Sequence, residues 1–101
     1  MNNELKNEIA NELERVIGKA IRKKLNPGDF GDIAIKIAEQ RMKYEQTTDE
    51  DEKKKISNNV KLLESQIKLK VETHILKLAK KGENALNKAI KAVLKKYLPF
   101  I

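Results

Sequence analysis

The sequence ISNNVKLLESQIKLKVETHILKL, residues 56–78, sets the expected architecture. Its apolar side chains advance in steps of three and four residues, the spacing of one face of an α-helix. This first row comprises Ile56, Val60, Leu63, Ile67, Val71, His74 and Leu78. A second row, Leu62, Leu69 and Leu76, repeats every seven residues on an adjoining face. The two rows together make an apolar surface too wide for a single neighbouring helix.

This stretch lies within a longer predicted helix over residues 49–81, which neither proline nor glycine interrupts. A helix of some 30 residues would be roughly 45 Å long at 1.5 Å per residue. Two alternatives remain open: a break at Ser57-Asn58-Asn59, and a strand over residues 67–72, where apolar and polar residues alternate. Because no turn residues flank residues 67–72, the helix is favoured.

Two amphipathic helices are predicted before it, over residues 3–25 and 30–45. The turn Asn26-Pro27-Gly28 separates them, because the residue before proline avoids the α region. Asp29 is expected to cap the second helix. Gly18, inside the first, is expected to let a neighbouring helix approach closely.

A last helix is predicted over residues 83–98. Gly82 is expected to end the preceding helix, and Thr48 is expected to cap that helix at its start. The expected fold is therefore all-α: one domain over residues 1–101, built as a small antiparallel bundle of about four helices with a long third helix.

Composition limits the setting of the protein. The chain has no cysteine, which rules out disulfides and thiolate zinc clusters and favours a reducing compartment. Its first residues are polar and acidic, unlike a secretory signal, and no stretch reaches about 18 consecutive apolar residues. We therefore expect a cytoplasmic protein and no membrane partner.

The residues that carry catalysis are scarce. The single histidine, His74, falls on the apolar row, where a core or interface role is the commoner one. Ser57 and Ser65 have no nucleophile-elbow context, and the four glycines form no phosphate-binding loop. We expect no enzyme, and we assign no catalytic residue, metal ligand, cofactor or small-molecule substrate.

Charge is the strongest remaining signal. The formal net charge is +7, and residues 56–101 carry ten lysines against three glutamates. Such a surface attracts polyanions, although lysine is also a common solubilising residue. The candidate anion-binding residues form a C-terminal group, Lys80, Lys81, Lys88, Lys91, Lys95 and Lys96, and a second group, Arg22, Lys23 and Lys24.

Residues 75–93, ILKLAKKGENALNKAIKAV, resemble the strand, glycine and helix of Alba-type chromatin proteins and of stage V sporulation protein S. The resemblance covers under a fifth of the chain. It implies a strand before the first helix and two after the second, and the sequence predicts none of these.

Two functions follow from these patterns. The first is a basic helical binding module, self-associating, that engages nucleic acid or another polyanion through its lysine-rich C-terminal surface. The alternative is a protein-partner module of the kind found in phages and bacterial defence systems: an inhibitor, an immunity protein, an assembly chaperone or a small complex subunit. That module would act through the apolar surface of residues 56–78, with Leu62, Leu69, Leu76 and His74 at the interface.

Overall fold

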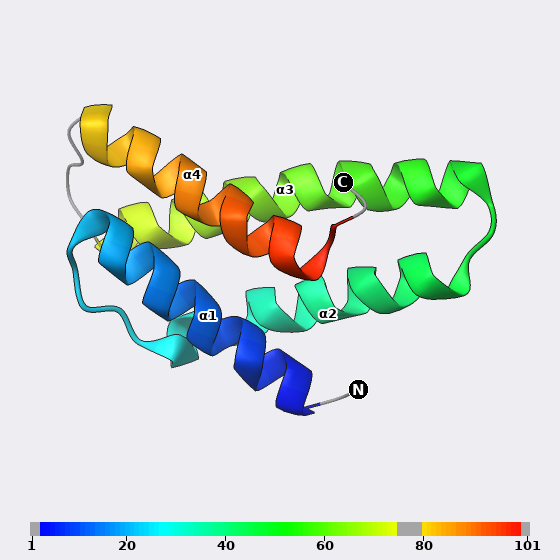
Figure 1. Ribbon diagram of the computed structural model, residues 1–101, viewed down its shortest axis with the longest axis horizontal. Coiled ribbons are helices and arrows are strands. Elements are labelled where there is room, and N and C mark those ends of the chain that lie inside the picture. The colour runs from blue at the N-terminus through cyan, green and yellow to red at the C-terminus, as the bar shows by residue number, and fades with distance from the viewer. Residues whose placement is uncertain (1–2, 75–79, 100–101) are drawn as a thin grey trace.

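The computed structural model of the protein describes residues 3–74 and 80–99. They form four α-helices, α1 (Asn3–Ile21), α2 (Gly31–Gln46), α3 (Glu50–His74) and α4 (Lys80–Tyr97), with a short 3-10 helix, η1 (Pro27–Phe30), before α2. Successive helices run antiparallel, and α4 returns to pack against α1 (Figure 1). No strand occurs in these two ranges, so the predicted all-α bundle with a long third helix is confirmed.

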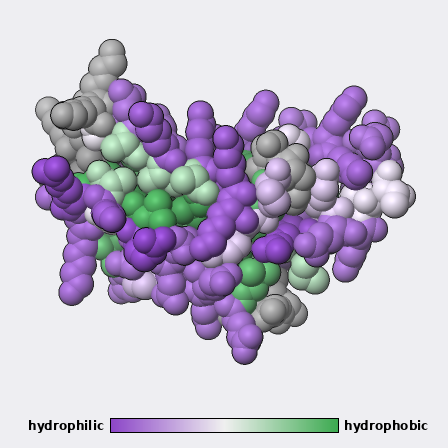
Figure 2. Space-filling view, in the orientation of Figure 1, coloured by the Kyte–Doolittle hydropathy of each residue, from purple (hydrophilic) through white to green (hydrophobic). Residues whose placement is uncertain are grey.

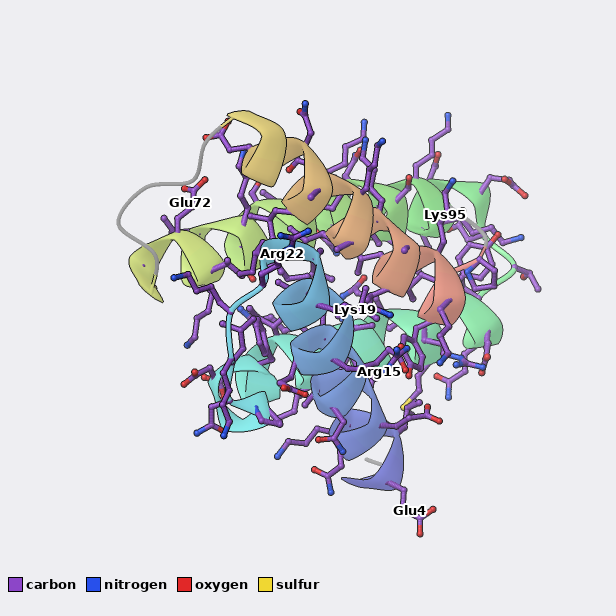
Figure 3. All side chains as sticks on the ribbon, turned by 60° about the vertical axis from the view of Figure 1, so that its left-hand side comes forward. Glu4, Arg15, Lys19, Arg22, Glu72 and Lys95 are labelled. Atoms are coloured by element: carbon purple, nitrogen blue, oxygen red, sulfur yellow. The ribbon has the colours of Figure 1, made fainter. Side chains whose placement is uncertain are left out.

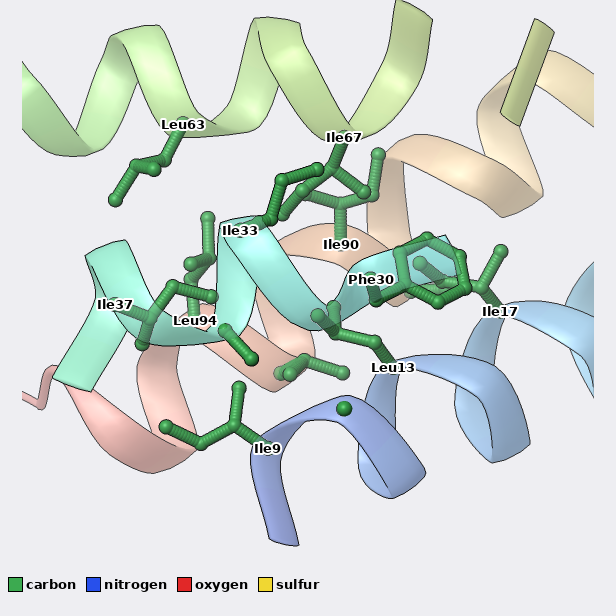
Figure 4. Packing of buried hydrophobic residues seen from close by; sticks show 14 of the residues in the cluster. Ile9, Leu13, Ile17, Phe30, Ile33, Ile37, Leu63, Ile67, Ile90 and Leu94 are labelled. Atoms are coloured by element: carbon green, nitrogen blue, oxygen red, sulfur yellow. The ribbon is translucent and has the colours of Figure 1, made fainter. Parts of the chain in front are cut away.

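The core forms where the apolar stripes of the four helices meet (Figure 4). Each fully buried Val, Leu, Ile or Phe side chain contributes about 1.5–3 kcal/mol relative to its exposed state. The polar side chain of Gln40 is also buried, and its Oε1 accepts a 3.3 Å hydrogen bond from Asn59 between α2 and α3. The largest buried side chains come from every helix: Ile9, Leu13, Ile17, Phe30, Ile37, Val60, Ile67, Val71, Leu86, Val93, Leu94 and Leu98.

The first helix ends at Ile21, four residues earlier than predicted. Arg22 adopts a left-handed backbone with φ of 56°, and the Lys23 N–H donates a 3.0 Å hydrogen bond to the Gly18 carbonyl. This is the Schellman arrangement, which satisfies a terminal carbonyl of the helix. Leu25 is buried although it lies beyond the helix, which explains why it fitted the helical spacing.

Gly18 serves this same turn and not a neighbouring helix. A Cβ atom at Gly18 would come within 2.9 Å of the Lys23 carbonyl oxygen, closer than real Cβ contacts allow. The close contact at Gly18 is therefore made by the connecting loop that contains Lys23, and not by the neighbouring helix that the sequence predicted.

The start of α2 also differs from the prediction. Asn26, and not Asp29, supplies the side-chain cap: its Oδ1 accepts a 2.9 Å hydrogen bond from the Gly28 N–H at the start of η1. The residue before α2 is Phe30, which has no side-chain cap hydrogen bond. Proline at the first position of η1 needs no hydrogen-bond acceptor there, so this turn forms readily.

The start of α3 is capped by Asp49 and not by Thr48. The Asp49 Oδ1 accepts a 2.9 Å hydrogen bond from the Asp51 N–H, and the Asp49 carbonyl accepts one from the Lys53 N–H at 3.1 Å. From there α3 continues through Ser57–Asn59 and through residues 67–72, so neither the break nor the strand occurs.

The boundary between α3 and α4 is where the prediction was least accurate. The helix expected over residues 49–81 ends at His74, and α4 begins at Lys80, so Gly82 lies inside a helix instead of ending one. A glycine inside a helix costs about 1 kcal/mol, which burial of an amphipathic face outweighs. A helix through Gly82 also departs from the strand-glycine-helix order of the Alba-type proteins. Leu76 and Leu78 lie outside the described residues.

We expect Arg22→Gly to raise the free energy of unfolding by about 1 kcal/mol, because glycine adopts positive φ without the steric cost that a side chain carries there. Urea denaturation followed by circular dichroism measures the change. Arg22→Ala, which removes the same charge but keeps a Cβ, is the matched control. A glycine variant no more stable than the alanine variant would refute this account of the turn.

Tyr97 places a polar atom inside the core. Its side chain is buried, and its hydroxyl makes no hydrogen bond of good geometry to the residues that the structure describes, although the Glu8 carboxylate is close enough to affect it. Burial first, and then the carboxylates of Glu8 and Glu12, raises the pKa of Tyr97 to about 12. We expect Tyr97→Phe to stabilise the protein by about 1 kcal/mol, because an unpaired buried hydroxyl has lost its hydrogen bonds to water. A destabilised variant in thermal denaturation would show that the hydroxyl has a partner.

Candidate polyanion-binding surface

The lysines of α4 lie on the side of the helix that faces away from the core. Leu86, Ile90 and Val93 point inward and are buried, whereas the predicted lysines at 88, 91, 95 and 96 are exposed. Steps of three and four residues bring Lys88, Lys91 and Lys95 into one line along the helix. The side chains of Lys80 and Lys81, in the first turn of α4, are outside the described part of the structure.

A second row of cations lies on α1. Arg15 and Lys19, four residues apart, are exposed on the same side of the helix, and the exposed Arg22 directly follows its end (Figure 3). Sequence reasoning identified only Arg22 of these three. The signal for Arg15 and Lys19 was present, because their spacing from Arg22 matches the helical repeat, but it depends on knowing which helix packs beside α1.

The packing of α1 against α4 joins the two rows into one surface, which we call the basic face: Arg15, Lys19 and Arg22 with Lys88, Lys91 and Lys95. Because the two helices are antiparallel neighbours, the end of α1 lies near the first turns of α4 (Figure 1). Hydrophilic side chains line both helices on this side of the molecule, with a narrow apolar strip between them (Figure 2). The second predicted group thus follows the end of the helix that packs against α4, on which Lys88, Lys91 and Lys95 of the first group lie. Lys23 and Lys24, also exposed, follow Arg22 in the connecting loop.

One ion pair links the two helices. The Lys96 Nζ donates a 3.0 Å hydrogen bond to the Glu12 carboxylate, which Arg15 also contacts. The Glu12 side chain is 13 % exposed. Hydrogen bonds from Lys96 and then from Arg15 hold the pKa of the Glu12 carboxyl below its usual value. Lys96 therefore takes part in the contact between α1 and α4 and is not part of the basic face.

Few carboxylates accompany the basic face. Twelve of the fifteen acidic residues precede residue 53. Within the two described ranges, no carboxylate oxygen lies within 4.0 Å of the ammonium groups of Lys88, Lys91 or Lys95. Glu64 on α3 is the acidic residue that lines open depressions beside Lys91 and Lys95. These depressions, of about 110 and 270 Å³, are shallow and do not enclose a ligand.

The apolar surface of residues 56–78 is mostly internal. Ile56, Val60, Leu63, Ile67 and Val71 are buried in the bundle. Of the predicted interface, Leu62 and Leu69 are 62 % and 63 % exposed. Leu76 and the side chain of His74 lie outside the described part.

The described residues form neither a metal-binding cluster nor a membrane-spanning helix. Across the described residues, no group of three or more His, Cys, Asp or Glu side chains is placed to hold a metal ion. None of the described helices is long and apolar enough to cross a bilayer. The chain matches no protein-family model, no curated protein and no solved structure.

The Glu12 contacts predict a pH-dependent contribution to stability. Because the folded pKa is lowered from 4.5, the contribution is present above pH 4.5 and is lost as the pH falls through the folded value. We expect Glu12→Gln to lower the free energy of unfolding at pH 7 by a few tenths to about 1 kcal/mol, the range of solvent-screened pairs. As the pH falls through the folded pKa of Glu12, the difference in stability between the two proteins should disappear.

Glu14→Gln is the matched control for this experiment, because it removes the same charge from the same helix. Urea unfolding at pH 7 and at low pH measures the free energy of unfolding of each protein. An equal loss of stability in Glu12→Gln and Glu14→Gln at pH 7 would contradict the interpretation.

Proposed function

We propose that this protein is a non-enzymatic binding module that holds the phosphate backbone of a nucleic acid on its basic face. The observation that carries the proposal is the set of six exposed cations on, or directly after, the two neighbouring helices α1 and α4. Among the described carboxylates, Glu12 contacts this group through Arg15, and Lys96 holds the same carboxylate. The basic face therefore has an excess positive charge that the fold itself does not neutralise.

The arrangement of these cations favours a polymeric anion. Steps of three or four residues along a helix separate neighbouring charges by about 5 Å along its axis. A small anion would meet one or two of them, whereas a chain of phosphates would meet several at once and release a counterion at each contact. Two parallel rows of cations offer such contacts along both helices.

The same residues support binding without sequence specificity. Lysine acts on phosphate as a point charge, and specific reading of bases depends on side chains directed into a groove. The described aromatic side chains offer no stacking surface here, because Phe30 and Tyr97 are buried and Tyr44 is on α2. Double-stranded nucleic acid, whose backbone is regular, is the best fit.

Membrane-surface binding by α4 is less well supported. An amphipathic helix binds lipid through its apolar face. In this fold the apolar face of α4, including Leu86, Ile90 and Leu94, is already buried against the other helices. Binding lipid through that face would require α4 to leave the core.

We expect the protein to bind a fluorescein-labelled DNA duplex with an affinity that falls linearly with salt concentration on a double logarithmic plot. The triple variant Lys88→Gln, Lys91→Gln and Lys95→Gln should reduce the slope by about 3, since each phosphate contact contributes about 0.9. Fluorescence anisotropy across a salt series measures both values.

The triple variant Lys43→Gln, Lys54→Gln and Lys55→Gln is the control. It removes the same net charge at exposed positions on α2 and the start of α3, away from the basic face. Equal loss of affinity in the two triple variants would mean that net charge alone attracts the DNA. No measurable binding by the native protein at low salt would overturn the proposal.

A further inference from the structure

A strip of α3 faces solvent without any charge. Residues 58, 59, 62, 65, 66, 69 and 73 are all exposed, and none is acidic or basic, although 37 % of the chain is charged. We call these residues the uncharged strip: Asn58, Asn59, Leu62, Ser65, Gln66, Leu69 and Thr73. Its two leucines are among the most exposed large apolar side chains described. Depletion of charge around exposed apolar residues is typical of the centre of a protein interface.

One edge of the uncharged strip lies beside α2. Asn59, Leu62 and Gln66 line a hollow of about 140 Å³ together with Lys36 and Gln40 of α2. Ser65, at the other edge, lines a depression that also contains Lys91 of α4. A partner centred on the α2 side of the strip would therefore leave most of the basic face uncovered.

The residues of the strip are complementary to themselves when two copies of α3 run antiparallel. A two-fold axis beside Gln66 places Leu62 opposite Leu69 of the second copy, and Leu69 opposite Leu62. The same register places Asn59 opposite Thr73 of the second copy, so that hydrogen-bonding side chains meet at both ends. A closed two-fold contact of this kind uses the same patch on both subunits.

Charge along one edge of the strip agrees with this register. Lys61 and Glu72 are exposed and lie on the same side of the strip, 11 residues apart. Antiparallel pairing brings Lys61 near Glu72 of the second copy, and symmetry repeats the contact. In a parallel pair, Lys61 would lie level with Lys61 of the second copy and Glu72 level with Glu72. The opposite charges would then be far apart.

We propose that the uncharged strip of α3 is the contact surface for a second copy of this chain, which pairs with it antiparallel through Leu62 and Leu69. In this register Leu69 of each copy would face Leu62 of the other copy, at the hollow between α2 and α3. One helix face buries less area than the roughly 800 Å² per partner of a standard stable interface. The dimer should therefore be weak and depend on protein concentration.

Salt should act on this contact in the opposite direction to nucleic-acid binding. Each copy carries a net charge of +7, so salt screens the repulsion between copies. Higher salt should strengthen the dimer, whereas it should weaken DNA binding to the basic face. The two proposals can therefore fail separately.

Sedimentation velocity over a concentration series at 0.3 M NaCl tests the contact. The native protein should shift from the 11.6 kDa of one copy toward twice that mass as concentration rises to about 1 mM. Leu62→Lys with Leu69→Lys should stay at the mass of one copy. Met42→Lys, at a 40 % exposed apolar residue of α2, should dimerise like the native protein. A native protein that stays monomeric, or a double variant that still dimerises, would overturn the proposal.

Single cysteines test the register, because the native chain has none. Antiparallel helices packed about 8–10 Å apart bring residue 66 of both copies together at the axis. Asn58 of one copy would lie about 22 Å from Asn58 of the other, at 1.5 Å per residue. A short bismaleimide should cross-link Gln66→Cys efficiently and Asn58→Cys poorly. Equal cross-linking at both positions would rule out the antiparallel arrangement. Circular dichroism of each variant establishes that it is folded.

Discussion

The packing of α4 against α1 is the interaction on which the rest of the structure depends. The two helices are far apart in the sequence, and their contact closes the bundle around the residues of α2 and α3. Because each helix turns its apolar stripe inward, its charged side is turned outward. The hydrogen bond from Lys96 to Glu12 links the outer sides of the same two helices. Core packing and the position of the surface cations are thus consequences of the same contact.

Segregation of charge follows from this arrangement. Acidic residues occupy the first turns of α1, α2 and α3, where carboxylates favour the helix dipole. The cations of α1 come late in the helix, and those of α4 occupy its outer side. Since α1 and α4 are antiparallel, the basic end of α1 lies near the basic α4. A local preference at each helix end therefore contributes to a charged surface on the scale of the whole molecule.

The sequence was sufficient to predict the helices, but not the residues at which they end or the helices that pack together. Apolar spacing predicted all four helices and the buried row from Ile56 to Val71, because burial of one face dominates helix stability. It misplaced the end of α1, since Leu25 is buried without being helical, and it misjudged Gly82, since packing outweighs glycine's low propensity. Arg15 and Lys19 could not be joined to Lys88 and Lys95 from the sequence, because that link is a contact between distant segments.

Self-association through the uncharged strip and nucleic-acid binding through the basic face would strengthen each other. A second copy centred on the α2 side of the uncharged strip leaves most of both basic faces exposed, because Asn59, Leu62 and Gln66 line a hollow with α2 and not with α4. Two basic faces in one particle would bind a long polyanion with a higher apparent affinity than either alone, since the second contact is intramolecular. Binding to a polymer would in turn concentrate the chain and promote a dimer that is weak in solution. Nucleic acid and self-association would thus be thermodynamically coupled, although salt acts on them in opposite directions.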